Sequence, residues 1–398
     1  MNRITQFVHG TGTVSEVLRR RRESGQPVPS NLLAFSDLRR PVVFWNITNR
    51  CNLRCSHCYI GAGPESRRED ELTTAEAKAL IDDLAGMQVP LLLFSGGEPL
   101  VRDDFWELAR HAAARDLTTA LSTNGTLITP EVARGLRDAG VEYAGISLDG
   151  ASPATHDRMR KMPGSFDRAV RGLESCVAAG LKCGVRVTAT RENYAEIPAI
   201  IDLALAMGVP RFCVYWLVPG GRGRDLHAAL QLGPREVEGV LDLLYRKARE
   251  LDPSVMEFLT VDAPQDAVHL LVRLQNDDPA AYASMCTLLG LAGAGCSAGD
   301  RIANIDPSGN VYPCQFAQTE ALKVGNVRER SFRDLWNDAE NPVLSRFRTK
   351  TERVTGACGR CPHRNVCGGG CRIRAFAVQG DLWADDPLCP LRRGDEDE

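Results

Sequence analysis

The sequence has no long hydrophobic run and little net charge. Its purely apolar stretches, such as Leu91–Phe94, fall far short of the roughly 18 apolar residues that a membrane-spanning helix needs. The first ten residues contain no apolar segment of the kind found in secretion signals, so we expect a cytoplasmic protein without a membrane span. The formal net charge of −3 is too close to zero to indicate a nucleic-acid-binding surface.

Cysteine is the residue that the chain has in excess. Of 398 residues, 43% are hydrophobic and 25% are charged, which is typical of a soluble globular protein of two or three domains. The 14 cysteines would form disulfides in a secreted protein, but nothing here indicates export. In a reducing cytosol, clustered cysteines more often hold metal. The composition therefore predicts a cytosolic metalloprotein rich in thiolates.

Short apolar runs alternate with amphipathic stretches through the first half of the chain. Such a series of strand–helix units is typical of a parallel α/β protein. Six units are too few for an eight-stranded barrel, so a partial barrel and a doubly wound sheet both fit the pattern. Thr73 or Thr74 could cap the first helix, with Glu76 in its first turn. The expected strands are 42–47, 90–95, 118–122, 143–148, 184–190 and 211–218, and the clearest helices are 74–87, 105–115 and 166–179.

The cysteine content divides the chain. We expect a polar N-terminal extension over 1–40, the strand–helix region over 41–220 and a mostly helical connector over 221–285. Residues 286–398 carry eight of the 14 cysteines and end in an acidic tail. We expect this last part to be a second domain that metal organises rather than a large core.

The first cysteine cluster lies just after the first expected strand. Cys51, Cys55 and Cys58 have C-x3-C-x2-C spacing, and three thiolates this close can surround one metal site. A zinc ion would want a fourth protein ligand, and His57 would be strained in that role beside Cys58. A cubane iron–sulfur cluster tolerates three protein ligands and leaves one iron open. A structural zinc loop is the alternative.

The run Cys51–Tyr59, CNLRCSHCY, resembles the signature of the radical S-adenosylmethionine (SAM) enzymes. The resemblance implies that the open iron of a 4Fe–4S cluster chelates SAM. It also implies that an electron from this cluster cleaves SAM to a 5′-deoxyadenosyl radical, which abstracts hydrogen. For the fold, it implies a partial six-stranded β/α barrel over about 41–220.

Further segments match the family where it binds SAM. In Ser95–Pro99, SGGEP, glycines allow a close backbone approach, and we expect an exposed carboxylate at Glu98. The resemblance implies that Arg160 approaches the SAM carboxylate, although Lys161 stands where the family often has glycine. Ordinary turn and capping chemistry is the alternative for these segments. The implied SAM-binding residues are Gly96, Gly97, Glu98, Ser122, Asn124, Ser147, Asp149 and Arg160.

The C-terminal cysteine spacing resembles the SPASM extension of radical SAM enzymes, which holds auxiliary 4Fe–4S clusters. Cys286 lies ten residues before Cys296 and could complete the second ligand set; otherwise one iron is open. A pair of zinc knuckles is the alternative. We interpret Cys176, Cys183 and Cys213 as core residues, since buried free cysteine behaves as a small hydrophobe. By the resemblance, one cluster is held by Cys358, Cys361, Cys367 and Cys389, and another by Cys296, Cys314 and Cys371.

Segments outside the cluster motifs resemble the tetrapyrrole-tailoring branch, which alters acetate and propionate groups of siroheme-derived tetrapyrroles on the way to heme or d1 heme. They are 41–48, 91–99, 220–224 and 380–389. Arginine forks suit the carboxylates of a tetrapyrrole, so Arg222 and Arg224 are candidate substrate contacts, with a solvated loop as the alternative. Some members of that branch lack an equivalent of Cys371, which this chain keeps.

Two other functions compete with tetrapyrrole tailoring. The SPASM extension often occurs in enzymes that mature peptides or proteins. A non-catalytic iron–sulfur or zinc scaffold for electron transfer belongs to a different class, and the open-ligand cluster beside Gly96–Glu98 argues against it. For an enzyme of either kind, we expect a reductant such as flavodoxin or ferredoxin as a partner, and no nucleic acid.

Overall fold

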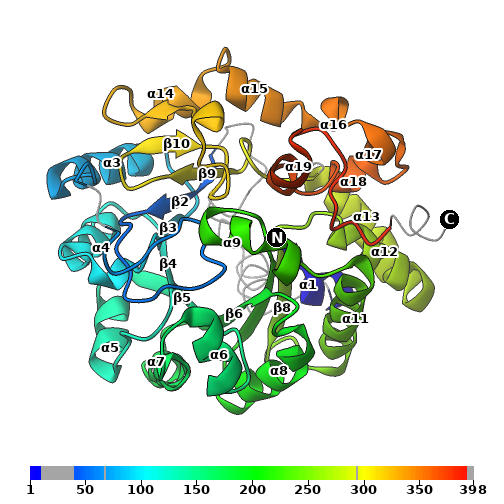
Figure 1. Cartoon of the computed structure of the whole chain (residues 1–398), viewed down its shortest axis with the longest axis horizontal. Coiled ribbons are helices and arrows are strands. Elements are labelled where there is room, and N and C mark those ends of the chain that lie inside the picture. The colour runs from blue at the N-terminus through cyan, green and yellow to red at the C-terminus, as the bar shows by residue number, and fades with distance from the viewer. Residues whose placement is uncertain (10–39, 67–68, 293–294, 392–398) are drawn as a thin grey trace, which may run out of the picture.

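The strands of this computed structural model form one continuous sheet (Figure 1). The structure describes residues 1–9, 40–66, 69–292 and 295–391. The predicted acidic tail and most of the predicted N-terminal extension lie outside the described residues. The order in the sheet is β1-β8-β7-β6-β5-β4-β3-β2-β9-β10-β11.

Strands β2 to β8 are neighbours in the same order as in the chain, and all pair in parallel. An order that never reverses excludes the doubly wound sheet, which needs a switch point. Figure 1 shows the helices as an outer ring around these strands, as in a partial barrel. The strands are β2 (Val42–Asn46), β3 (Leu92–Ser95), β4 (Thr119–Thr123), β5 (Val141–Ser147), β6 (Cys183–Ala189), β7 (Arg211–Trp216) and β8 (Glu257–Val261).

The six predicted strands correspond to β2–β7, and every predicted end lies within two residues of the observed one. The same holds for the three predicted helices, now α3, α4 and α7. Thr73 caps α3: its hydroxyl accepts the N–H of Glu76, whose carboxylate accepts the Thr73 N–H at 2.8 Å. The helices of the barrel are α3 (Thr74–Gly86), α4 (Phe105–Ala113), α5 (Pro130–Asp138), α6 (Pro153–Arg160), α7 (Ser165–Ala178) and α8 (Ile197–Ala206).

The prediction of a mostly helical connector missed strand β8. This strand pairs in parallel with β7 and extends the barrel by one strand. It begins with Glu257, which is fully buried and forms ion pairs with Arg3 and Arg211. Because this first residue is charged, the segment does not show the apolar run expected of a buried strand. The helices of this region are α9 (Gly221–Asp225), α10 (His227–Leu230), α11 (Pro234–Glu250), α12 (Asp266–Asp277) and α13 (Pro279–Ala292).

The first nine residues belong to the fold. Strand β1 (Asn2–Arg3) pairs antiparallel with β8, and α1 (Ile4–His9) buries Ile4 and Phe7 in the main core. The expectation of a purely polar lead is therefore wrong for residues 2–9.

The cysteine-rich region continues the sheet at its other edge. Strand β9 (Ile302–Ile305) pairs in parallel with β2, and β10 (Asn310–Tyr312) and β11 (Gly325–Asn326) follow it antiparallel. Trp336 packs in the same hydrophobic core as the barrel strands. The expectation that metal rather than a large core organises this region is therefore wrong. The remaining helices are α14 (Phe332–Asn337), α15 (Pro342–Arg348), α16 (Lys350–Arg353), α17 (Gly356–Arg360), α18 (Arg364–Cys367) and α19 (Arg372–Gln379).

None of the helices within the described ranges has the length and hydropathy that a bilayer span requires.

Candidate active site

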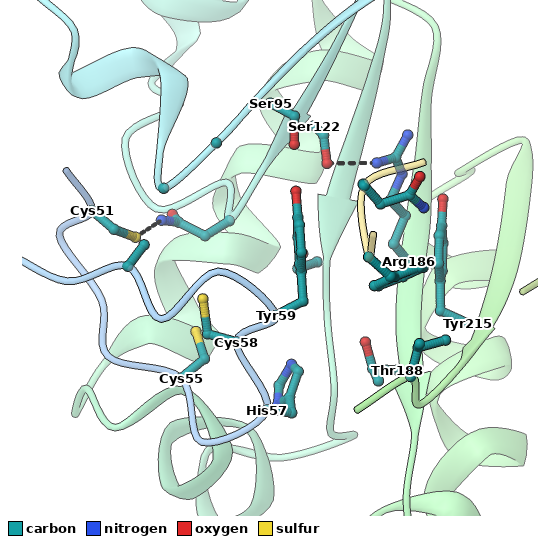
Figure 2. Close-up of a pocket in the computed structure, with 18 of the residues that line it drawn as sticks. Cys51, Cys55, His57, Cys58, Tyr59, Ser95, Ser122, Arg186, Thr188 and Tyr215 are labelled. Carbon is teal, nitrogen blue, oxygen red and sulfur yellow. Dashed lines mark hydrogen bonds between the residues drawn. The ribbon is translucent and has the colours of Figure 1, made fainter. Parts of the chain in front are cut away.

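Three thiols of the first cysteine cluster face one cavity at the carboxyl end of the barrel (Figure 2). Cys51, Cys55 and Cys58 lie on the loop that leaves β2, and none forms a disulfide. The Cys51 N–H donates to the Gly63 carbonyl at 3.1 Å, which closes this loop. The structure therefore brings together the three residues that the sequence predicted as ligands.

The Arg222 side chain binds the backbone of the cysteine loop. Its guanidinium donates to the carbonyls of Cys55 at 2.9 Å, Gly61 at 2.7 Å and Ala62 at 2.7 Å. Three of the five guanidinium N–H groups thus bind the loop backbone, although Arg222 also lines the cavity. Arg224, the other predicted substrate contact, is exposed and lies outside the cavity lining.

The glycine pair after β3 packs against the backbone that leads into the cysteine loop. The Gly97 N–H donates to the Thr48 carbonyl at 2.7 Å. A Cβ atom on Gly97 would lie 2.0 Å from the Arg50 carbonyl oxygen, so only glycine fits. Gly96 has φ +136° and lines the cavity beside Gly97.

Glu98 is fully buried, so the expectation of an exposed carboxylate is wrong. Its oxygens accept the Thr123 hydroxyl at 2.8 Å and the Asn124 N–H at 2.8 Å. Burial raises the pKa of Glu98 to about 7 against the lowering effect of these hydrogen bonds. The side chain thus holds the loop after β4 in place.

Arg160 connects the cysteine loop to Asp149. Its Nη1 lies 3.5 Å from the Cys55 sulfur and its Nη2 lies 2.5 Å from Asp149 Oδ2. Burial acts to raise the pKa of Asp149, but the charges of Arg160 and His57 outweigh it and lower that pKa below its usual range. Lys161 takes the left-handed conformation, φ +55°, which ends α6 where the family often has glycine.

His57 is a site residue that sequence reasoning dismissed. Its Nε2 lies 3.2 Å from Asp149 Oδ2, and the ring lines the cavity. Its Nδ1 is buried without a hydrogen-bond partner among the described residues. His57 thus lies beside the cysteines, and its Nδ1 makes no hydrogen bond to the described residues.

The other predicted SAM contacts also surround this cavity. Asn124 Nδ2 donates to Asn52 Oδ1 at 2.8 Å and lies 3.9 Å from the Cys51 sulfur. Ser122 and Ser147 line the cavity at the ends of β4 and β5.

Several cavity residues were missed because they lie inside strands. Arg186 and Thr188 on β6 alternate with buried valines, so the period of two in this strand was the available signal. Tyr215 on β7, Asp262 after β8 and Gln315 after β10 also line the cavity. No sequence pattern brings these three together.

The structure separates the C-terminal cysteines into two groups, as the resemblance implied. Cys296, Cys314 and Cys371 line a second cavity. Cys286 lies exposed on α13 and is not part of that lining. In the other group, Cys361 is close enough to affect Cys367 electrostatically, and both Cys367 and Cys358 are close enough to affect Cys389.

The two cavities share a wall. Asp262, Gln315 and Phe316 line both of them. The cavity lined by the second cysteine group therefore adjoins the first cavity at these side chains.

The surroundings of the thiols fit iron–sulfur clusters. Burial, followed by the nearby charge of Glu98, raises the pKa of Cys51 to about 12, and burial also raises the pKa of Cys55 against the charge of Arg160. A bound cationic cluster would stabilise the thiolates that the protein alone disfavours. The predicted core cysteines Cys176, Cys183 and Cys213 are all buried.

Comparisons with known proteins agree with this arrangement. The radical SAM superfamily profile matches residues 45–204, and that of the SPASM iron–sulfur cluster-binding domain matches 296–362. Fe-coproporphyrin III synthase of Methanosarcina barkeri is 40% identical over 98% of this chain and 97% of its own. Pre-heme d1 synthase of Dinoroseobacter shibae is 37% identical over 88% and 86%, and mycofactocin maturase MftC of Mycobacterium tuberculosis is 36% identical over 91% and 86%.

Among solved structures, Streptococcus suis SuiB bound to S-adenosylmethionine aligns with a TM-score of 0.66 at 20% identity, over 94% of this chain and 82% of SuiB. This likeness shows a shared fold. The cofactors of the protein are 4Fe–4S clusters and SAM, so the zinc alternatives and the electron-transfer scaffold are set aside. With identity of 40% across nearly the whole length of both chains, the protein belongs to the radical SAM superfamily of enzymes and carries a SPASM domain.

Proposed function

We propose that the protein modifies carboxylate-bearing side chains of a siroheme-derived tetrapyrrole, with an iron coproporphyrin as its product. The observation that carries this proposal is the 40% identity to Fe-coproporphyrin III synthase over almost all of both chains. The similarity to pre-heme d1 synthase supports the same substrate class.

The first cavity would hold the catalytic cofactors. We assign Cys51, Cys55 and Cys58 as ligands of the SAM-binding cluster, because all three thiols face this cavity. When bound and reduced, this cluster cleaves SAM and supplies a 5′-deoxyadenosyl radical that abstracts a hydrogen atom. The protein's own contribution is to bind, orient and shield the reactants.

The SAM contacts divide into two kinds. Gly96 and Gly97 would present backbone to the amino group, since both lie at the cavity surface. Arg160 would attract the SAM carboxylate next to Cys55, and Asp149 positions Arg160. Ser122, Asn124 and Ser147 would line the remaining surface, with Glu98 holding the Asn124 loop.

The C-terminal region would hold the auxiliary clusters. We assign Cys358, Cys361, Cys367 and Cys389 to one cluster. We assign Cys296, Cys314 and Cys371 to another, and Cys286 as a fourth ligand would have to approach from the exposed face of α13. We keep the domain bounds 1–40, 41–220, 221–285 and 286–398, and each of these four parts contributes at least one strand to the sheet.

The electron would come from a flavodoxin or ferredoxin in the cytoplasm, where low-potential reductants are available. Arg222 would act on this chemistry indirectly by holding the loop that carries Cys55. A direct contact of Arg222 or Arg224 with substrate stays a prediction.

The test is anoxic incubation of the reconstituted full chain with SAM, dithionite and either siroheme or didecarboxysiroheme, read by mass spectrometry. We expect 5′-deoxyadenosine together with a tetrapyrrole that has lost carboxylate groups. Formation of 5′-deoxyadenosine with both tetrapyrroles unchanged would contradict the proposal.

Peptide maturation is the second candidate, because MftC is 36% identical over 91% of this chain. The same assay with a precursor peptide in place of the tetrapyrrole separates the two. A mass change in the peptide but not in the tetrapyrrole would favour maturation.

A further inference from the structure

Arg186 places a cation on the cavity wall opposite the cysteines. It lies in the middle of β6, and its Nη1 donates to the Ser122 hydroxyl at 2.6 Å. Its guanidinium also lies over the Tyr215 ring, 5.6 Å from the ring centre. These neighbours fix its position but are uncharged.

The neighbouring strand is shaped around this guanidinium. Gly145 on β5 lies beneath it, and a Cβ atom there would lie only 2.0 Å from Arg186 Nε. The Arg186 guanidinium therefore fits here because Gly145 has no side chain.

Arg186 has no carboxylate partner in the part of the chain that the structure describes, whereas other arginines of the barrel do. Arg160 lies 2.5 Å from Asp149. Arg211 lies 2.9 Å from Glu257. A partly buried cation without a counter-ion is unfavourable, so an anion is expected to bind here.

Asp262 is the other charged group that faces Arg186. The two are near enough to interact electrostatically but form no ion pair, and Asp262 Oδ2 has no hydrogen-bond partner among the described residues. Burial raises the pKa of Asp262 to about 7, which weakens its role as a counter-ion. The other titratable neighbours are Tyr59, Tyr143, Cys213 and Tyr215, and burial raises the pKa of all four.

The cavity thus has cations on two opposite sides. Arg160 lies at the Cys55 sulfur. Figure 2 shows Arg186 with Thr188 and Tyr215 across the cavity, and Tyr59 between the two sides. A SAM molecule bound at the cysteines would bring its own carboxylate to Arg160. The second cation is then available to a second anionic molecule.

We propose that the Arg186 guanidinium, held in place by the Ser122 hydroxyl, forms a subsite that binds a carboxylate of the substrate. The planar guanidinium fork matches a carboxylate with two parallel hydrogen bonds. This inference rests on the proposed function, since a tetrapyrrole presents several carboxylates. The inference names Arg186, a residue within strand β6, as a determinant of substrate specificity in addition to the loop residues that line the cavity.

The test compares wild type with Arg186→Gln, Arg186→Lys and Gly145→Ala, all as reconstituted full chains. Iron coproporphyrin III and its tetramethyl ester, which lacks free carboxylates, are the probes, titrated by absorbance in the presence of SAM. We expect Arg186→Gln to raise the Kd for the free acid about 10- to 100-fold. Arg186→Lys should lose less, and Gly145→Ala should weaken binding by displacing the unaltered guanidinium.

Two controls accompany this titration. Arg171→Gln removes one positive charge on the exposed surface of α7 and should leave the Kd within about threefold. SAM cleavage without substrate should also stay within about threefold in Arg171→Gln, because this residue lies outside the cavity lining.

The outcomes are distinct. An unchanged Kd in Arg186→Gln, or an equal loss for the ester, would overturn the subsite. Loss of substrate-free SAM cleavage in that variant would assign Arg186 to SAM and overturn it as well. Failure of the wild type to bind the free acid would instead overturn the proposed function, and the subsite with it.

Discussion

At the residue scale, burial of Cys55 disfavours the thiolate form of its side chain, and a bound metal cluster would stabilise that form. Cys55 is 8% exposed, and the Arg160 guanidinium lies 3.5 Å from its sulfur. We expect Cys55→Ala to lose the SAM-binding cluster, and with it about four iron atoms per chain. Iron analysis and 5′-deoxyadenosine formation after anoxic reconstitution measure both losses.

Cys176→Ala is the matched control. Cys176 is also buried, but it lies on α7 within the main hydrophobic core. We expect unchanged iron content and SAM cleavage, with destabilisation of about 1 kcal/mol from the small cavity. Equal iron loss in the two variants would contradict the assignment of Cys55.

Asp266 gives a prediction about pH at the same scale. It is fully buried at the start of α12, and its carboxylate accepts the Trp216 indole N–H at 2.7 Å. Burial raises its pKa to about 7 from 3.8, so between these values the folded protein holds a proton that the unfolded chain releases. The stability from this group is therefore complete below about pH 4 and is lost as pH rises to about 7.

We expect the free energy of unfolding of the wild type, relative to Asp266→Asn, to fall by up to about 1.4 kcal/mol per pH unit over this window. Asparagine keeps the acceptor for Trp216 but cannot titrate. Anoxic thermal unfolding of both proteins between pH 5.5 and pH 8 measures the difference. Parallel curves would show that Asp266 does not titrate in this range.

At the element scale, the carboxyl ends of β2 and β3 are held together by backbone contacts that glycine alone permits. A Cβ atom at Gly97 would meet the Arg50 carbonyl oxygen at 2.0 Å, and that oxygen cannot move unless the cysteine loop moves. We expect Gly97→Ala to lower SAM cleavage at least tenfold and to lower the melting temperature. A 5′-deoxyadenosine assay and thermal unfolding measure these effects.

Gly239→Ala makes the same chemical change where there is room for it. Gly239 lies exposed on α11, and no atom lies within 4 Å of its added Cβ. Because alanine favours a helix over glycine, we expect stabilisation by about 0.5–1 kcal/mol with unchanged activity. Similar losses in both variants would show that the site does not depend on the close approach at Gly97.

The sequence predicted six barrel strands because each contains a short apolar or β-branched run between helical stretches. It missed β8 because Glu257 begins that strand, and Glu257 is tolerated there only because Arg3 and Arg211 bind it. These partners lie 254 and 46 residues away in the chain. No local pattern contains such information.

At the scale of the whole molecule, one buried ion pair fastens the cysteine-rich region to the barrel. Arg374 on α19 lies 2.9 Å from Asp386, and both are almost fully buried. The same guanidinium donates to the carbonyls of Leu217 at 3.1 Å and Asp262 at 2.8 Å, at the ends of β7 and β8. Asp386 also accepts the Cys371 N–H at 2.7 Å, so the pair connects an auxiliary-cluster cysteine to the barrel.

We expect Arg374→Met to destabilise the protein by about 3–5 kcal/mol, because it leaves the Asp386 charge buried and unpaired. Denaturant unfolding of the reconstituted protein measures the change. The exposed pair Arg330–Asp338, at 3.0 Å, is the control, and Arg330→Met should cost about 1 kcal/mol or less. A loss below about 1 kcal/mol in Arg374→Met would contradict this role.

The sequence by itself indicated the cofactor chemistry, through its resemblance to the radical SAM and SPASM motifs, and the barrel strands, through their apolar runs, because both are local properties of the chain. Only the tertiary structure decided that Glu98 is buried, that Arg222 binds the cysteine loop and that Arg186 faces the cavity without a carboxylate partner in the described chain. It also made one sheet of regions that the sequence divides, through the pairing of β2 with β9. The physical reason is that a charged side chain's role depends on the groups that surround it, and folding brings those groups from distant parts of the chain.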